Sequence, residues 1–320
     1  MPEPFRLDSY NMRPLKNTCE VAVIGGGLAG LSAARHAARL GRLVTLFEGS
    51  ALFGGLVATV GEVEGLPVPG KFSGQDLAMH LLEDARKAAV QIVETGVTKI
   101  ELAERLTLID QENRTYHPEA IIVASGASLR KLGVRGEEEF IGRGVSRCAT
   151  CDGGFFRGQD VVVVGGGDGA VQEALVLAKT SRRVFMVCRS PLKAKRDYIE
   201  KLAARENVSF VWDSEVSSIL GDDGVSGVRL RNLKDGTSSD LECAGLFPFI
   251  GATPNSAFAP ASLLTATGHI RTGAGLATSD SRVFAAGAVR ADYGGNLVQA
   301  MAEGVGAAEA VARAATLVAM

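Results

Sequence analysis

The chain has almost no net charge and no long apolar run. Lysine and arginine (34) nearly balance aspartate and glutamate (36), for a formal charge of −2 over 320 residues. Attraction to nucleic acid or to an acidic membrane surface is therefore not expected. No apolar run reaches the roughly eighteen residues of a membrane-spanning helix. Residues 1–17 are polar and lack the apolar centre of a signal peptide. We expect a cytoplasmic protein.

Cysteine is scarce, with five residues in 320, and histidine scarcer still, with four. An odd and small number of cysteines excludes a disulfide scaffold and suits a reducing compartment in which any disulfide is catalytic. Cys148 and Cys151 form a C-x-x-C pair, which zinc or redox chemistry can use. A zinc site usually takes four ligands, and the remaining candidates are isolated, so we expect no metal. The isolated residues are Cys19, Cys188, Cys243, His36, His80, His117 and His269.

Glycine, by contrast, is abundant, and its first cluster lies in a β-α-β pattern. A buried strand at 21–24 precedes Gly25–Gly30, a helix follows to about Leu40, and a second strand at 43–47 ends in Glu48. In a G-x-G-x-x-G loop, Gly25 permits the tight turn, Gly27 lets backbone amides approach a pyrophosphate, and Gly30 lets helix and strand pack closely. Glu48 is placed to accept hydrogen bonds from a ribose.

The same pattern recurs about 140 residues later. A strand at 161–164 precedes Gly165–Ala170, and a helix to about Thr180 and a strand at 184–187 follow. Gly165 and Gly167 take the first two motif positions, and Asp168 is expected to tune the capping of the helix. Two dinucleotide units with a C-x-x-C pair between them predict disulfide redox chemistry.

Two further segments indicate crossings between domains, at 121–126 and 247–251. If both are hinges, the second dinucleotide unit is inserted in the first. The predicted fold is therefore α/β, with two Rossmann-like domains of the three-layer ββα/α type. We expect an FAD-binding domain from residues 1–126 and 249–320, and a second dinucleotide-binding domain with the redox centre from 127–248.

Several longer motifs make a family resemblance specific. They are Ala124–Ala127, Gly142–Ser146, Cys148–Gly153, Phe249–Asn255 and Val283–Gly287. On these motifs the chain resembles the low-molecular-weight thioredoxin reductases over nearly its full length. The resemblance implies FAD in the first domain, a small dithiol or disulfide redox protein or thiol as partner, and a homodimer.

The resemblance also implies roles for single residues. Cys148 and Cys151 would form the redox disulfide, with Cys151 facing the flavin, and Asp152 would transfer the proton of the exchanging thiol. A helix from about Leu297 would point its N-terminus at the flavin. The implied cofactor residues are Gly25, Gly27, Gly30, Glu48, Gly126, Gly287, Ala288, Gln299 and Ala300 for FAD, and Gly165, Gly167, Asp168 and Arg189 for the second nucleotide.

The sequence departs from that family around both cofactors. The usual arginine clamp for a 2′-phosphate is reduced to Arg189, with Ser190 after it and Lys193 further on. Ala288 stands where the family has an aspartate that bonds the ribityl chain. Other departures are Leu56 after Gly55, Gly154 in place of an aromatic residue, and Val298 before Gln299.

These departures leave several hypotheses open. The leading one is an FAD-dependent disulfide oxidoreductase that is not a standard NADPH-driven enzyme, with a second FAD in the second domain and electrons flowing from dithiol to flavin. The alternative is an NADPH-dependent thioredoxin reductase with a relaxed motif, and a third is a ferredoxin-driven relative. A non-enzymatic nucleotide-binding redox sensor would not need Cys148, Cys151 and Asp152 together. In the enzymatic hypotheses, domain rotation presents the dithiol to flavin and partner in turn.

Overall fold

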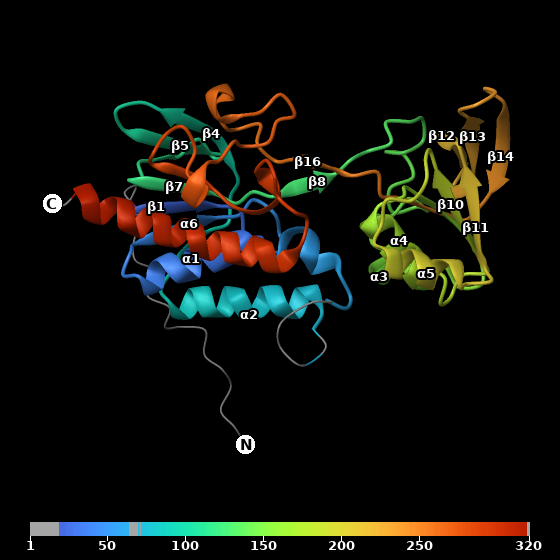
Figure 1. Cartoon of the computed structure of the whole chain (residues 1–320), viewed down its shortest axis with the longest axis horizontal. Helices are drawn as coiled ribbons and strands as arrows, with labels where there is room; N and C mark the ends of the chain where they lie inside the picture. The colour runs from blue at the N-terminus through green and yellow to red at the C-terminus, as the bar shows by residue number, and fades with distance from the viewer. Residues whose placement is uncertain (1–18, 64–69, 71, 319–320) are drawn as a thin grey trace, which may run out of the picture. The chain divides into compact units, whose positions relative to one another are not determined.

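The computed structural model describes residues 19–63, 70 and 72–318 (Figure 1). Segment 1–17, whose polar composition underlies the cytoplasmic prediction, lies outside them. Contacts divide the chain into two compact units, unit 1 with residues 1–55, 78–126 and 256–320, and unit 2 with residues 56–77 and 127–255. Among the described residues, no helix is long and apolar enough to cross a membrane.

Unit 1 is built on a parallel sheet with the order β17-β7-β1-β2-β3. All four residues of β1 and of β2 are buried, as expected for strands covered on both faces. Ile24 pairs with Phe47 on one side and with Val123 on the other, so the ends of these three strands are level. The strands are β1 (Val21–Ile24), β2 (Val44–Phe47), β3 (Gln91–Val93), β7 (Ala120–Val123) and β17 (Val283–Ala285).

Two helices of unit 1, α1 (Leu28–Arg39) and α6 (Leu297–Val318), run side by side (Figure 1). Small residues let them approach: a Cβ atom on Gly304 would lie 2.1 Å from the carbonyl oxygen of Ala29. Helix α2 (Gly74–Lys87) belongs to unit 1 from Ala78 onward. A separate antiparallel sheet completes the unit, with β4 (Val97–Leu102), β5 (Leu106–Asp110) and β6 (Thr115–Tyr116).

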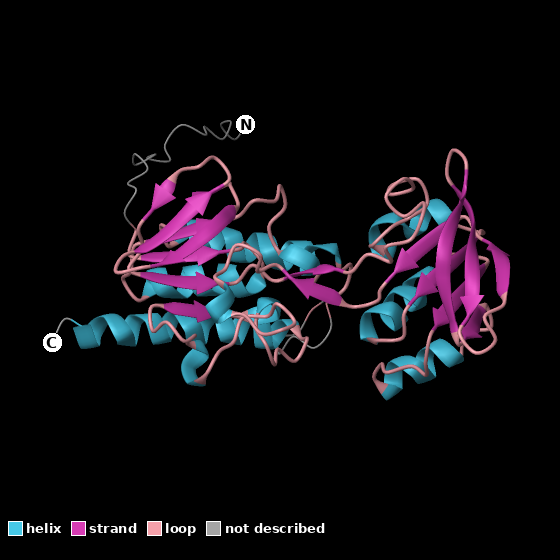
Figure 2. Cartoon of the chain, turned by 90° about the horizontal axis from the view of Figure 1, so that it is seen from above, coloured by secondary structure: helices cyan, strands magenta, loops and turns pink. Residues whose placement is uncertain are grey.

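Unit 2 repeats the plan around a parallel sheet with the order β11-β10-β9-β15, and Figure 2 shows helices beside the strands in each unit. An antiparallel sheet β12-β13-β14 and the pair β16-β8 are added. The helices are α3 (Ala149–Asp152), α4 (Asp168–Leu177) and α5 (Arg196–Ala203). The strands are β8 (Ala127–Leu129), β9 (Asp160–Val164), β10 (Arg183–Cys188), β11 (Val208–Trp212), β12 (Ser214–Gly221), β13 (Val225–Asn232), β14 (Ser238–Glu242), β15 (Gly245–Pro248) and β16 (Ala252–Pro254).

A buried carboxylate fixes one end of the central sheet of unit 2. Asp160, the first residue of β9, binds both Arg182 and Arg183, with the shortest contact at 2.6 Å to Arg183. The hydrogen bonds from Arg182 lower the pKa of Asp160 to about 2, although burial opposes this shift. The start of β9 and the start of β10 are thereby held together.

The two β-α-β patterns predicted from the sequence are confirmed, as β1-α1-β2 and β9-α4-β10. The α/β class is confirmed as well, with one parallel sheet in each unit. The contacts assign residues 56–77 to unit 2. The division expected from the sequence placed these residues in the FAD-binding domain. Within the second crossing segment, strand β15 ends at Pro248, and β16 begins directly after the segment, at Ala252.

The close approach of α1 and α6 generates a stability prediction. Gly304→Ala places a methyl group against the carbonyl of Ala29, which we expect to cost about 1–3 kcal/mol and to lower the melting temperature by several degrees. Gly306→Ala on the same helix is the control, because its Cβ atom would meet only the side chain of Leu276 at 3.6 Å. Thermal unfolding followed by circular dichroism measures both. Equal melting temperatures for the two variants would contradict the packing argument.

Candidate redox and nucleotide sites

The C-x-x-C pair lies at the start of the short helix α3 and is oxidised. Cys148 and Cys151 form a disulfide. Cys148 is the N-cap of α3, and its sulfur accepts a hydrogen bond from the amide of Cys151 at 3.0 Å. The Cys148 side chain is buried, with its sulfur 3.1 Å from the carbonyl oxygen of Thr59, whereas Cys151 is exposed. Cys151 is therefore the more accessible of the two sulfur atoms.

A serine holds the predicted proton-transfer residue against this helix. Ser146 is buried, and its hydroxyl donates to Oδ2 of Asp152 at 2.6 Å. The same hydroxyl oxygen accepts from the amide of Cys148 at 3.1 Å. Asp152 is thus tied through Ser146 to the backbone of the redox cysteine. The sequence indicates Asp152 through the family motif, but only the folded structure reveals the contact that Ser146 makes.

A second carboxylate contacts the amino end of α3. Glu173 of α4 accepts a hydrogen bond from the amide of Ala149, the first residue of α3, at 2.6 Å. Burial raises the pKa of Glu173 above its ordinary value, and the bond from Ala149 opposes this shift. Sequence reasoning missed Glu173, because no motif marks its approach to the dithiol.

The first glycine loop has the geometry that a dinucleotide requires. Gly25 has φ +105°, and a Cβ atom there would lie 2.5 Å from the carbonyl oxygen of Ala124. A Cβ atom on Gly30 would lie 1.8 Å from the carbonyl oxygen of Gly25. Gly27 is the N-cap of α1, open space surrounds its missing Cβ, and no described side chain caps the helix. The first amides of α1 are therefore available to a phosphate.

Glu48 follows β2 at the same edge of the sheet. One carboxylate oxygen accepts from the amide of Gly26 at 2.6 Å, and the other accepts from the amide of Ser50 at 2.7 Å. A carboxylate has about four acceptor positions, so both oxygens can still accept from ribose hydroxyls. The glycine loop, the uncapped helix and Glu48 together fit the adenosine and pyrophosphate of FAD. Gly126, with φ +66°, ends the last segment of unit 1 before β8.

The C-terminal residues assigned to the flavin meet around a buried carboxylate. The amide of Gly287, a residue with φ +75°, donates to Glu303 at 2.8 Å. Arg290 donates to Glu303 at 2.6 Å, and the side chain of Gln299 donates to it at 2.7 Å. Burial disfavours the Glu303 carboxylate, but these hydrogen bonds outweigh burial and hold its pKa below the ordinary value. Glu303 lies one helical turn beyond Gln299, a spacing that could have indicated it.

Helix α6 begins at Leu297, close to the position predicted from the sequence. The side chain of Asn296 accepts from the amide of Gln299 at 2.8 Å, which is the bond an N-cap asparagine makes. Ala300 is buried, 3.9 Å from where a Cβ atom on Gly287 would lie. Ala288 directly follows Gly287 and brings no polar side chain to this turn.

The second glycine loop is tied to the segment that follows β10. Gly165 has φ +134°, and Gly167 is the N-cap of α4. The amide of Lys193 donates to the carbonyl of Gly166 at 2.7 Å. The prediction that Asp168 tunes the capping of α4 is wrong. Asp168 is the first residue of α4, and its carboxylate accepts from the amide of Lys195 at 2.7 Å. Gly167 occupies the N-cap position, so no described side chain caps α4 and its first amides are open, as at α1.

Arg189 is the predicted cation of the second site. Its side chain is exposed, and Nη1 lies 4.0 Å from a carboxylate oxygen of Glu215. Glu215 also binds Arg231, so two arginine side chains share one carboxylate. Cys188, the residue before Arg189, is buried, and its thiol donates to the carbonyl of Gly165 at 3.2 Å. Burial raises the pKa of Cys188 to about 11, so this thiol stays protonated near neutral pH.

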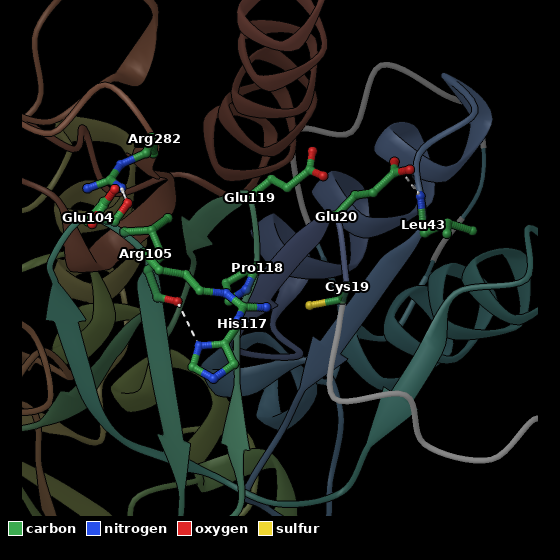
Figure 3. Close-up of a pocket in the computed structure, with 10 residues that line it drawn as sticks. Cys19, Glu20, Leu43, Glu104, Arg105, His117, Pro118, Glu119 and Arg282 are labelled. Carbon is green, nitrogen blue, oxygen red and sulfur yellow. Dashed lines mark hydrogen bonds between the residues drawn. The ribbon is translucent and has the colours of Figure 1, made fainter. Parts of the chain in front are cut away.

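A cavity of about 510 Å³ in unit 1 contains none of the predicted site residues (Figure 3). Cys19 and Glu20 in its lining precede β1, Leu43 precedes β2, and Arg282 precedes β17. The cavity therefore lies at the amino ends of these strands, whereas α/β sheets bind nucleotides at the carboxyl ends. We assign it no part in nucleotide binding.

Comparisons with known proteins identify the family of this chain. A sequence model of the pyridine nucleotide-disulphide oxidoreductases matches residues 19–304. The thioredoxin reductase of Treponema pallidum is 37% identical over 92% of this chain and 96% of its own length. That of Streptomyces coelicolor is 37% identical over 84% of this chain and 85% of its own. The crystal structure of Lactococcus lactis thioredoxin reductase superposes with a TM-score of 0.87 and 32% identity, over 92% of this chain and 98% of that one.

The buried carboxylate of Glu303 predicts a pH-dependent stability. Its pKa is lower in the folded protein than in the unfolded chain, so its stabilising effect is present above about pH 4.5 and is lost as the pH falls through the lowered value. We expect Glu303→Gln to cost about 3 kcal/mol at neutral pH, because Arg290 loses its buried partner. The difference from the parent protein should shrink in acid.

Thermal unfolding at neutral pH and at about pH 3.5 measures this difference. Glu309→Gln on the same helix is the control, because Glu309 is exposed and its contacts with His36 and Arg313 are worth little. A Glu303→Gln penalty that is the same at both pH values would rule out the ionised pair as its cause.

Proposed function

Since the chain belongs to the pyridine nucleotide-disulphide oxidoreductase family, we propose that its Cys148–Cys151 disulfide passes electrons from bound FAD to a small dithiol protein. The chain is a flavin-dependent disulfide oxidoreductase of the thioredoxin reductase type. The observation that carries the proposal is the disulfide itself, at the start of α3, with Asp152 held beside it by Ser146. Bound FAD supplies a two-electron carrier.

The exchange follows from the chemistry of the two cysteines. Two electrons and two protons break the Cys148–Cys151 bond and leave two thiols. One of them, as the thiolate, attacks the disulfide of the partner and forms a mixed disulfide. The second thiol then displaces the partner, which leaves with two thiols as the Cys148–Cys151 bond forms again. We propose that Asp152 accepts the proton of the attacking thiol and returns it to the leaving sulfur.

For the electron donor, we propose NADPH, bound at the loop Gly165–Gly167 in unit 2. The thioredoxin reductases that the chain resembles support a nicotinamide donor. Arg189 is then the main cation for the 2′-phosphate. The carboxylate of Glu215, 4.0 Å from Arg189, competes with the phosphate for this positive charge. A single shared arginine discriminates poorly between a 2′-phosphate and a 2′-hydroxyl. We therefore expect only a weak preference for NADPH over NADH.

A second candidate function keeps FAD at both dinucleotide sites, with electrons flowing from the dithiol to the flavin. Two observations favour it. Ser190 follows Arg189 where an NADPH clamp would have a second arginine. The missing Cβ of Gly154, three residues beyond Cys151, is surrounded by open space. For both candidate functions, we propose a homodimer in the cytoplasm. Its partner is a thioredoxin-like protein or a small thiol.

Counting flavin and adding nicotinamide separates these candidates. We expect one flavin per chain after denaturation, and anaerobic bleaching of the intact protein by NADPH no more than about tenfold more efficiently than by NADH. Arg189→Ala should erase that remaining preference. Two flavins per chain without bleaching by either nucleotide would replace this proposal with the diflavin function. One flavin that responds only to a reduced ferredoxin would point to the third donor class.

Replacing either redox cysteine tests the exchange itself. Cys148→Ser and Cys151→Ser should each abolish reduction of a disulfide partner, because an intramolecular disulfide can no longer form, while FAD remains bound. Cys243→Ser is the matched control, because Cys243 is buried and free. Flavin absorbance and thioredoxin reduction are the two measurements. Normal turnover by either redox variant would refute the assignment.

A further inference from the structure

The short helix that carries the redox pair has a carboxyl group at its amino end. Glu173 accepts the amide of Ala149, the residue directly after Cys148. The amide of Cys151 is directed to the sulfur of Cys148, and the amide of Asp152 to the carbonyl of Cys148. A backbone amide directed at the first sulfur of a C-x-x-C turn favours the thiolate of that cysteine, because the amide is the positive end of a dipole. A carboxylate at the amino end of α3 acts in the opposite direction.

Glu173 differs in this respect from Asp152, the other carboxylate near the disulfide. Asp152 is bound by a hydroxyl that can reorient, whereas Glu173 is bound by a backbone amide with a fixed direction. Glu173 is also partly buried, and burial raises its pKa. A desolvated carboxylate and a nearby thiolate disfavour each other, because the low local dielectric strengthens their repulsion.

Several titratable and charged groups lie on the elements that pack against α4, the helix of Glu173. Helix α4 packs against α3, α5, β9 and β10. Burial raises the pKa of Glu173, and the hydrogen bond from the amide of Ala149 opposes this shift. The titratable and charged groups on those elements are Cys151 and Asp152 on α3, Asp160 on β9, Arg183 and Cys188 on β10, and Arg196, Asp197, Tyr198, Glu200 and Lys201 on α5.

We propose that Glu173 is a positioning residue that holds α3 on α4 and whose charge sets the pH at which the reduced Cys148 thiol ionises. The inference builds on the proposed function, in which this dithiol is reduced in every turnover. With Glu173 ionised, the thiol of Cys148 keeps its proton to a higher pH, so that removal of the proton depends on Asp152. The Cys148 thiolate therefore forms mainly when Asp152 takes the proton of the thiol.

The isosteric variant Glu173→Gln separates charge from position. Its amide oxygen can still accept from Ala149, so α3 keeps its anchor while the negative charge is lost. We expect the apparent pKa of the Cys148 thiol to fall by about 0.5–1 unit, which raises its thiolate fraction at neutral pH roughly three- to tenfold.

The measurement is the rate of iodoacetamide alkylation of the reduced, FAD-containing protein between about pH 5 and pH 9.5, with mass spectrometry reading Cys148 and Cys151 separately. The other three thiols are silent in this range, because burial raises the pKa of Cys19 and of Cys188 to about 11 and that of Cys243 to about 12. Glu200→Gln is the matched control: it removes an exposed carboxylate of α5 and should leave the profile unchanged.

Two further outcomes decide the proposal. Glu173→Ala removes charge and anchor together, so we expect the same fall in the thiol pKa and faster hydrogen exchange at the amides of Ala149 and Cys151. An unchanged alkylation profile in Glu173→Gln would overturn the proposal, even if Glu173→Ala alters it, because the effect would then be positional alone. Neither nucleotide nor partner is added, so this result is independent of the experiments on flavin content and turnover.

Discussion

Both units depend on backbone segments that pass closer to one another than a side chain allows. A Cβ atom on Gly30 would lie 1.8 Å from the carbonyl oxygen of Gly25, and one on Gly165 would lie 2.2 Å from that of Phe249. These approaches let α1 and α4 begin directly after their strands, with no described side chain capping their first amides. Gly304 likewise lets α6, which carries Gln299 and Glu303, pack directly against the backbone of α1. Close backbone contacts therefore fix the position of the helix from which Gln299 and Glu303 project.

Much of this arrangement could be predicted from the sequence, because its causes are local. Strand, glycine turn and helix follow one another within Val21–Arg39 and again within Asp160–Leu177, and each step has a residue pattern of its own. The family resemblance, which the relatives confirm, added the redox role of Cys148 and Cys151. The proposed domain ends at 126 and 248 stay predictions, and the contacts change unit at 126 and at 255.

The contacts around the sites could not be predicted, because they join residues far apart in the chain. Glu173 reaches Ala149 across 24 positions, and Arg189 meets Glu215 only because β10 and β12 lie near each other. Asp168 shows the same limit: its position next to Gly167 suggested a cap, but its partner is the amide of Lys195, 27 residues away. Carboxylates recur in these contacts because they accept hydrogen bonds from amides and attract guanidinium groups, and composition does not reveal which acid will do so.

The three free cysteines, all buried, have a use beyond packing. Cys19 belongs to unit 1, whereas Cys188 and Cys243 belong to unit 2. A thiol in the folded protein can react only when its surroundings open locally, so its labelling rate reports the free energy of that opening. The native chain thus contains one internal probe in the first unit and two in the second. Pulsed thiol labelling can therefore measure whether local opening in unit 1 and local opening in unit 2 occur independently, without any engineered label.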